Sequence, residues 1–250
     1  MNAETLDDIL NGQLKICQRR NGYRFSLDAL LLAHFVSLRK NTHAVELGCG
    51  SGVIMLIMAS RFPHVHFTGL EIQDELWELA QKNICINSLN ERVAAIRGDA
   101  KDIKKYLPKS SFDCVFFNPP YRMLNSGRIN PDSQKAIARH EIKGSVTDFI
   151  QAAKYLIKPN GKIFVIYPAK RLAHLIWTLK NNYMEPKRMR LVFSAADMPA
   201  EFVLVEAANQ GREELKVEPP LYVFDQDKKY TPQMKIIFRE LASPPGGVAG

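Results

Sequence analysis

The sequence has few cysteines and no long apolar run. Its four cysteines, Cys17, Cys49, Cys85 and Cys114, are scattered and form no C-x-x-C pair. This spacing argues against both a disulfide framework and a zinc cluster, so we expect no metal site. No stretch reaches the roughly 18 consecutive apolar residues that a membrane-spanning helix needs. We therefore expect a protein that neither binds a metal nor enters a membrane.

The N-terminus also lacks the basic and then apolar pattern of a secretory signal peptide. With 46% apolar and 24% charged residues, the composition is that of a globular protein with a substantial core. These features predict a cytoplasmic location. The length of 250 residues suits a main domain over residues 41–242, preceded by a hairpin and helix over residues 1–40 and followed by a disordered tail over residues 243–250.

Acidic residues are scarce in one segment of a chain whose net charge is +8. Between Lys154 and Arg190 there are nine Lys or Arg residues and a single acid, Glu185. A concentrated positive charge attracts a polyanion, and nucleic acid is the obvious candidate. The alternative is a solvated helix face beside basic strand ends, because charge supports binding without naming the partner.

The N-terminal region predicts a hairpin followed by a helix. Residues Leu14–Gln18 alternate as a short strand does, and Asn21-Gly22 is a strong turn signal. Ser26 is a suitable N-cap for a helix that runs to about Leu38. Arg24, just ahead of this helix, is either a surface arginine or a residue that holds a carboxylate in a two-pronged contact.

A glycine-rich turn follows the first buried strand, Ala44–Leu47. The turn is Gly48-Cys49-Gly50-Ser51-Gly52, and an apolar helix continues from Val53 to about Arg61. Strand, glycine turn and helix form the nucleotide-binding opening of an open α/β sheet. The third glycine of the dinucleotide motif G-x-G-x-x-G is missing, because Val53 stands in its place, and this disfavours an NAD site.

Two acids end the next two predicted strands. Glu71 follows His66–Leu70 and lies 19 residues after Gly52, close to the spacing at which an acid reaches a ribose diol. Asp99 follows the strand Arg92–Arg97 and could accept a hydrogen bond from an adenine amine. Either acid could instead merely cap the helix that follows it. We expect Asp74 to cap the helix after Glu71.

The fourth predicted strand, Asp113–Phe117, ends in Asn118-Pro119-Pro120-Tyr121. Proline pushes the residue before it out of the helical region, so Asn118 is extended at a rigid turn and its side chain is held. A fixed amide oxygen, a Pro119 carbonyl and an aromatic ring suit a planar NH2 group. Ligands of open sheets gather at the carboxyl ends of the strands, so this motif, the two acids and the glycine turn face one crevice.

The remaining chain completes an α/β pattern. Residues 122–140 form a long polar loop that we expect to grip the substrate, with a mere surface loop as the alternative. The further predicted elements are a helix at Thr147–Ile157, a strand at Lys162–Tyr167, a helix at Ala169–Asn181, an antiparallel pair at Arg188–Phe193 and Phe202–Ala207, and a last helix from Thr231-Pro232.

Taken together, the segment Val45–Gly52, Glu71, Gly98-Asp99-Ala100 and the N-P-P-Y motif resemble class I S-adenosylmethionine-dependent methyltransferases that methylate amino groups. The N-terminal Gly22–Asp28 and the later Pro219–Tyr222 with Tyr230-Thr231 resemble the bacterial tRNA1(Val) adenine-N6 methyltransferases, which modify the adenine 3′ of the anticodon. The resemblance implies a Rossmann-like α/β fold with a seven-stranded, mostly parallel sheet, an antiparallel last pair, and helices on both faces.

The resemblance also implies roles for individual residues. The S-adenosylmethionine contacts would be Arg24, Phe25, Glu46, Gly48, Cys49, Gly50, Gly52, Glu71, Ile72, Asp99, Ala100 and Asn118. The catalytic motif would be Asn118, Pro119, Pro120 and Tyr121, and the tRNA contacts would be Tyr121, Arg122, Arg128, Lys135, Lys170 and Arg171. Cys49 occupies a variable position of the turn, so we do not expect it to be a nucleophile.

Two other functions remain open at this stage. The N-P-P-Y motif also suits the glutamine amide of a protein such as a release factor, although such enzymes usually carry a sizeable helical domain before the glycine turn and 45 residues precede Glu46 here. A non-catalytic RNA-binding protein with a methyltransferase fold is the second alternative, and the intact motif speaks against it. A DNA adenine methyltransferase would be expected to add a target-recognition insert, and none of suitable size is visible.

Overall fold

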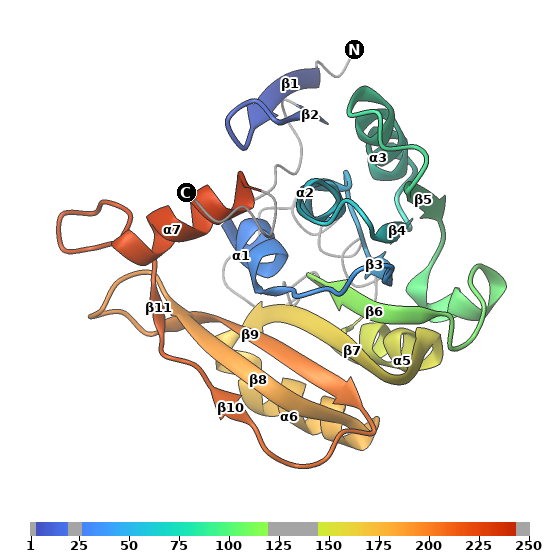
Figure 1. Cartoon of the computed structure of the whole chain (residues 1–250). Helices are drawn as coiled ribbons and strands as arrows, with labels where there is room; N and C mark the ends of the chain where they lie inside the picture. The colour runs from blue at the N-terminus through green and yellow to red at the C-terminus, as the bar shows by residue number, and fades with distance from the viewer. Residues whose placement is uncertain (1–3, 20–26, 120–144, 244–250) are drawn as a thin grey trace, which may run out of the picture.

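The computed structural model describes residues 4–19, 27–119 and 145–243. Its centre is a nine-stranded sheet (Figure 1). The strands are β3 (His43–Leu47), β4 (His66–Glu71), β5 (Val93–Arg97), β6 (Phe112–Phe117), β7 (Ile157–Pro168), β8 (Met184–Phe193), β9 (Ala200–Asn209), β10 (Lys216–Val217) and β11 (Leu221–Tyr222). Their order is β10-β8-β9-β7-β6-β3-β4-β5, and β11 also pairs with β8.

The sheet is mostly parallel, as the sequence predicts. The strands β5, β4, β3, β6 and β7 are parallel, whereas β9 is antiparallel to both β7 and β8. The expected number of seven strands is too low. The two-residue strands β10 and β11 pair with β8 in parallel, and they cover the outer edge of a strand that would otherwise leave backbone groups unpaired.

Helices cover both faces of the sheet (Figure 1). On one face lie α1 (Leu27–Phe35), α2 (Val53–Arg61), α3 (Asp74–Ile86) and α7 (Pro232–Leu241). On the other lie η1 (Ala100–Lys105), α5 (Val146–Leu156) and α6 (Leu172–Asn181), which is preceded by the short η2 (Ala169–Arg171). Successive residues of β6 alternate between two cores: Cys114 and Phe116 pack with the first layer, Val115 and Phe117 with the second. Burial on both faces explains the continuous apolar runs of the central strands.

The N-terminal hairpin differs from its prediction. The strand β2 (Leu14–Arg19) pairs in antiparallel fashion with β1 (Glu4–Ile9), the strand that precedes it in the sequence. The turn between them contains Asn11 and Gly12, which adopt φ of 57° and 81°. The prediction missed β1, because its residues, Glu-Thr-Leu-Asp-Asp-Ile, do not alternate between polar and apolar side chains and none of them is fully buried. The expected turn at Asn21-Gly22 lies outside the described residues.

The hairpin is attached to α3 through asparagine side chains. Asn83 is fully buried; its Oδ1 accepts from the Cys17 N–H at 2.7 Å, and its Nδ2 donates to the Cys17 carbonyl at 3.1 Å and the Ser51 carbonyl at 3.0 Å. One turn later, Asn87 exchanges a similar pair of hydrogen bonds with Lys15. A single buried amide therefore connects the hairpin, α3 and the loop that contains Ser51.

Several element boundaries shift for local reasons. The helix α1 ends at Phe35, before the expected Leu38, and α3 is preceded by Gln73 as its N-cap, with Asp74 inside the first turn. The strand β7 begins at Ile157 because Ile157 pairs with Phe112 before the register jumps. The last helix, α7, begins as predicted, with the Thr231 hydroxyl accepting from the Met234 N–H.

Within the described ranges, no helix is both long and apolar enough to cross a membrane.

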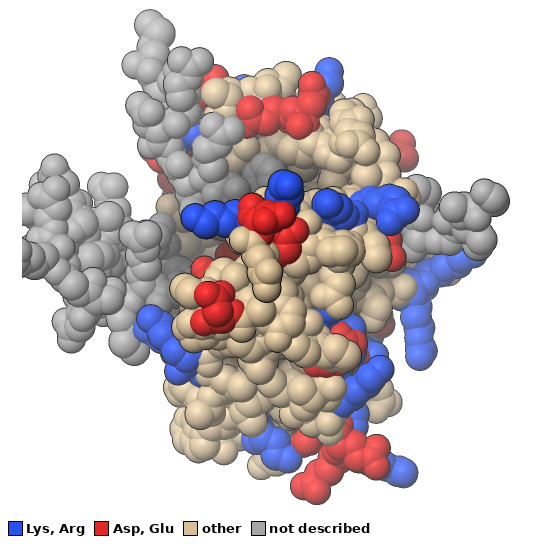
Figure 2. All heavy atoms as spheres, turned by 90° about the vertical axis from the view of Figure 1, so that its left-hand side faces the viewer, with Lys and Arg blue, Asp and Glu red and all other residues tan. Residues whose placement is uncertain are grey.

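Four of the nine basic residues of the segment 154–190 form ion pairs among the described residues, mostly with acids that lie outside the segment. Ion pairs join Lys158 to Asp113, Lys162 and Arg188 to Glu206, Arg188 to Glu218, and Lys180 to Glu185 and Glu213. The face seen in Figure 2 likewise carries Lys and Arg interspersed with Asp and Glu. The described residues on this face therefore form no continuous basic surface.

We predict that Glu206 stabilises the fold above acid pH. Burial alone would raise its pKa, but the cations of Lys162 at 2.6 Å and Arg188 at 2.8 Å outweigh it, so the pKa of Glu206 lies below its usual value of 4.5. A carboxylate with a lowered folded pKa contributes stability above its unfolded pKa and loses it as the pH falls through the folded pKa. Glu206→Gln should lower the free energy of unfolding by about 1–3 kcal/mol at pH 7.

The measurement is urea unfolding of wild type and Glu206→Gln between pH 7 and pH 3, where the difference should shrink. Glu201→Gln, an exposed change on the same strand β9, is the control and should cost little at any pH. A Glu206→Gln deficit that stays constant down to pH 3 would contradict this account.

Candidate functional site

The carboxyl ends of β3, β4 and β6 meet at one edge of the sheet. The chain leaves β3 through α2 toward β4 on one side, whereas β6 pairs with β3 on the other side. This is a topological switch point, where connections run in opposite directions and leave a crevice above the strand ends. The glycine turn follows β3 and Asn118 follows β6, so both lie at this crevice.

The glycine turn is held by the neighbouring strand. Gly48, Gly50 and Gly52 adopt φ of 70°, 56° and 83°, a left-handed conformation that favours glycine. The backbone N–H groups of Gly48 and Cys49 both donate to the Leu70 carbonyl of β4, at 2.7 and 3.0 Å. Because these contacts fix the start of the turn, its remaining backbone is presented at the N-terminus of α2.

Two buried carboxylates flank the turn. Glu46 of β3 is 1% exposed, and its Oε2 accepts from the Met55 N–H at 3.1 Å. Glu71 ends β4, and its two oxygens accept from the Gly50 and Gln73 N–H groups, each at 2.9 Å. Burial raises the pKa of Glu46 well above its usual value, the Met55 hydrogen bond opposes this rise, and the negative charge of Glu71 adds to it. The two acids therefore shape the turn, Glu71 through the Gly50 N–H and Glu46 through the Met55 N–H.

Asn118 has one satisfied and one unsatisfied end. Its Nδ2 donates to Oδ2 of Asp28, on α1, at 2.9 Å. Its Oδ1 is buried and has no hydrogen-bond partner among the described residues. A buried acceptor without a partner is rare in native proteins and points to a ligand or to catalysis. The amide is thus oriented with its carbonyl available.

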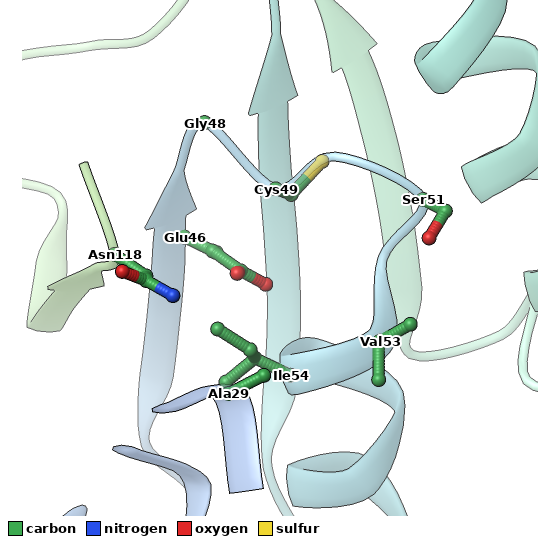
Figure 3. A pocket seen from close by; sticks show the side chains of 8 residues that line it. All are labelled: Ala29, Glu46, Gly48, Cys49, Ser51, Val53, Ile54 and Asn118. Atoms are coloured by element: carbon green, nitrogen blue, oxygen red, sulfur yellow. The ribbon is translucent and has the colours of Figure 1, made fainter. Parts of the chain in front are cut away.

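These groups share one pocket. Its lining comprises Ala29, Glu46, Gly48, Cys49, Ser51, Val53, Ile54 and Asn118. Figure 3 shows the side chains of Glu46 and Asn118 extending from adjacent strands into the same space, with Ala29 and Ile54 below them. The sequence predicted Glu46, Gly48, Cys49 and Asn118 as site residues. It missed Ala29, Ser51, Val53 and Ile54, although the last three lie within or directly after the glycine turn.

The other predicted residues divide into three groups. Gly50 and Gly52 belong to the turn, Glu71 reaches it through Gly50, and Ile72 follows Glu71 at the edge of β4. Asp99 accepts from the Lys101 N–H at 2.9 Å and thereby caps η1, in which Ala100 is the first residue. The residues Arg24, Phe25, Pro120, Tyr121, Arg122, Arg128 and Lys135 lie outside the described residues.

Lys170 and Arg171 lie in η2, directly after the carboxyl end of β7, and so at the same edge of the sheet as the pocket. Lys170 is exposed, and the Arg171 guanidinium donates to the Tyr167 hydroxyl at 3.5 Å. Among the described residues neither forms an ion pair, in contrast to most of the basic segment around them. They therefore leave positive charge unpaired at this edge.

Cys49 is not arranged as a nucleophile. Burial raises the pKa of its thiol well above the usual value, and the carboxylates of Glu46 and Glu71 raise it further. The thiol therefore stays protonated and poorly nucleophilic at neutral pH. Its role is packing: a Cβ added to Gly69 of β4 would lie 2.7 Å from the Cys49 Sγ, so Gly69 lets the turn approach the strand.

No group of three His, Cys, Asp or Glu side chains within the described ranges is placed to hold a metal ion.

Known proteins share this fold and much of this sequence. A methyltransferase domain family model matches residues 38–231. The tRNA1(Val) (adenine(37)-N6)-methyltransferase of Vibrio cholerae is 31% identical over 194 residues, which are 78% of this chain and 79% of that relative. The protein of the same description from Porphyromonas gingivalis is 32% identical over 135 residues. That alignment spans 53% of this chain and about half, 52%, of the relative's length.

Solved structures agree with the fold. A predicted O-methyltransferase of Agrobacterium tumefaciens superposes with a TM-score of 0.71 at 21% identity, covering 87% of this chain and 98% of that one. Geranyl diphosphate C-methyltransferase of Streptomyces coelicolor, solved with S-adenosyl-L-homocysteine, gives 0.53 at 12% identity, covering 72% and 78%. At these identities the likeness concerns the fold alone.

The sheet order, with its switch point above a three-glycine turn, is the architecture of class I methyltransferases. The extent of the sequence match is more specific: the chain belongs to the methyltransferase domain family and, within it, to the family of the bacterial tRNA1(Val) adenine-N6 methyltransferases.

We predict that Glu46→Gln stabilises the protein in the absence of ligand. Because the folded pKa of Glu46 is raised, its contribution to stability is fully present below the unfolded pKa, near 4.5, and is lost as the pH rises through the folded pKa. Glutamine keeps an acceptor for the Met55 N–H and carries no charge. The melting temperature of Glu46→Gln should therefore exceed that of wild type at pH 7–8, by ~2–4 °C for each 1 kcal/mol gained.

Thermal unfolding at several pH values tests this, with Glu78→Gln on the exposed side of α3 as the control for removing a glutamate charge. The gain should vanish below pH 4.5, where both forms of residue 46 are neutral. A Glu46→Gln protein less stable than wild type at pH 8 would show that the charge of Glu46 is compensated within the protein.

Proposed function

We propose that this chain transfers the methyl group of S-adenosylmethionine to N6 of an adenine in tRNA, at the position 3′ of the anticodon. The observation that carries the proposal is the buried Oδ1 of Asn118, which has no partner among the described residues, on a residue that follows β6 and lines the pocket of the glycine turn. The names of the relatives from Vibrio cholerae and Porphyromonas gingivalis support the same substrate. A cytoplasmic location fits such a substrate.

The pocket suits S-adenosylmethionine in shape and in charge. The glycine turn leaves room for close approach of a ligand, because side chains are missing at three positions whose backbone has positive φ. Glu46 brings a carboxyl group into the pocket, and Glu71 and Asp99 lie at the ends of the two strands β4 and β5. We propose that these residues, with Gly48, Cys49 and Ala100, hold the cofactor. When bound, the cofactor supplies an electrophilic methyl group on a sulfonium.

The residues at the end of β6 would activate the adenine amine that accepts the methyl group. The lone pair of an adenine amine is delocalised into the ring, so the nitrogen is a poor nucleophile. In the proposal, Asn118 Oδ1 and the Pro119 carbonyl accept the two N–H bonds of this amine and align its lone pair for attack. Methylation makes the nitrogen acidic, and its extra proton leaves to solvent, so no strong base is needed.

The proposal assigns substrate contacts beyond the pocket. Tyr121, which lies outside the described residues, would stack on the target base. In other nucleic-acid-binding proteins such stacking contributes about 1–3 kcal/mol to the binding free energy per base. A base in an anticodon loop is reached at lower cost than one in a duplex, because it is not paired. Lys170 and Arg171 would contact the RNA backbone, and Arg24, Phe25, Arg122, Arg128 and Lys135 stay predicted contacts.

Glutamine in a protein is the other acceptor that an N-P-P-Y motif suits. Methyl transfer from labelled cofactor, offered unmodified tRNA and a release factor in parallel, separates the two. Label recovered as N6-methyladenosine supports the proposal, whereas label in the protein would overturn the substrate.

We predict that Asn118→Ala retains the cofactor and loses turnover. The substitution removes the acceptor for the reacting amine, which matters most in the transition state, so kcat should fall roughly 100-fold or more while the cofactor Kd changes little. Steady-state methylation of tRNA and equilibrium binding of the cofactor are the two measurements. Cys114→Ala, in the same strand but facing the first core layer, is the control for damage to β6. Near-normal turnover of Asn118→Ala would refute the proposed role.

We predict that Lys170 and Arg171 contribute to tRNA binding through charge. Each single change to Ala should weaken tRNA binding and reduce the slope of log affinity against log salt by about 0.7–0.9, with kcat unchanged at saturating tRNA. Lys109→Ala is the matched control, because Lys109 is exposed just before the amino end of β6, at the opposite edge of the sheet. Equal salt slopes for all three variants and wild type would remove these residues from the interface.

A further inference from the structure

Asn118 could face the pocket with either end of its amide. The oxygen and the nitrogen of an asparagine side chain are nearly equal in size, and only hydrogen bonds decide which one points where. The chemistry at N6 needs an acceptor, so a flipped amide, with its NH2 toward the pocket, would oppose the N–H donors of the substrate. A reliable site therefore needs a group that selects one orientation.

The partner of Asn118 supplies such a selection. Asp28 is 6% exposed, and its Oδ2 lies 2.9 Å from Asn118 Nδ2. An ionised carboxylate has acceptors only, so it accepts from the NH2 end and repels the carbonyl end. The remaining end, Oδ1, is buried without a partner among the described residues, and Asn118 is one of the residues that line the pocket.

Asp28 is itself held in place. It is the second residue of α1, and its Oδ1 lies 3.0 Å from the Ala29 N–H. The neighbouring residues Ala29, Leu31 and Leu32 are buried in the first core layer, so the carboxylate stands on a packed helix. The pair connects α1 to the end of β6 across 90 residues of sequence.

We propose that Asp28 is a positioning residue that fixes the Asn118 amide with its carbonyl toward the acceptor nitrogen. This inference rests on the proposed function, in which Asn118 Oδ1 accepts from that nitrogen. Asp28 contacts neither substrate nor cofactor in this role. It acts through Asn118 by a charge-assisted hydrogen bond that the flipped amide cannot form.

A double-mutant cycle tests the inference. Asp28→Ala should lower kcat for tRNA about 10- to 100-fold, the loss expected for a hydrogen bond to a charged group, with the cofactor Kd unchanged within about twofold. In an Asn118→Ala background the same change should lower kcat no further, because the residue it orients is gone. Equal fold-losses in both backgrounds would overturn the proposal.

Two further variants separate positioning from folding. Asp28→Asn offers both an acceptor and donors, so it permits both orientations and should give a kcat between those of wild type and Asp28→Ala. Asp113→Ala removes a carboxylate that accepts from the His43 N–H and from Lys158 at the amino end of β6. It should lower stability and leave kcat unchanged. A kcat of Asp28→Asn equal to that of Asp28→Ala would count against selection between two orientations.

A readout without turnover keeps this inference distinct from the proposed function. The side-chain NH2 signals of Asn118 in a nitrogen-15 correlation spectrum can be assigned by their loss in Asn118→Ala. In wild type one of the two protons should lie downfield and exchange slowly, and Asp28→Ala should return it to the position of a free amide. Unchanged signals would refute the contact. Absence of methyl transfer to tRNA by wild type would instead refute the proposed function.

Discussion

The site depends on how the glycine turn is attached to β4. Because the first two N–H groups of the turn donate to one carbonyl, that of Leu70, the turn cannot move without breaking the sheet edge. Glu71 continues this attachment through Gly50, and Glu46 holds the following helix through Met55. Gly69 permits the close approach, since any side chain there would collide with Cys49. The glycine turn is thereby held by backbone and carboxylate contacts to two strands of the buried parallel sheet.

The strands around this crevice and the residues that end them were predictable from the sequence for a physical reason. Parallel strands buried on both faces are continuous apolar runs, and the residues that end them, such as Glu71 and Asn118, stand out because they interrupt the run. Contacts between distant segments were not predictable in the same way. Asp28 meets Asn118, and Asn83 meets Cys17, only because α1, α3 and the hairpin pack on the same face of the sheet. The short strands β10 and β11 likewise owe their pairing to the open edge of β8.

The net charge of a sequence segment is a poor predictor of the charge of a surface. The segment 154–190 is strongly basic when it is read in isolation, yet Asp113, Glu206 and Glu218 reach into it from other elements. Among the residues of this segment that form no ion pair in the described part of the chain, Lys170 and Arg171 stand out because η2 places them after the carboxyl end of β7, at the edge of the sheet where the pocket lies. The number of basic residues in a segment is therefore a poor guide to a nucleic-acid surface. The position of the basic residues that form no ion pair, relative to the strand ends, is a better one.

Two polar groups of the pocket are costly to bury, and each would be stabilised by a different kind of ligand group. Glu46 is a buried carboxyl group whose ionisation is disfavoured by desolvation and only partly supported by the Met55 N–H, and the Asn118 Oδ1 has no donor among the described residues. A purely apolar ligand would leave both costs in place. A ligand with a positive charge would offset the first, and one with N–H donors would offset the second. In the proposed function, the cationic methyl donor would meet the first demand and the amine of the acceptor would meet the second.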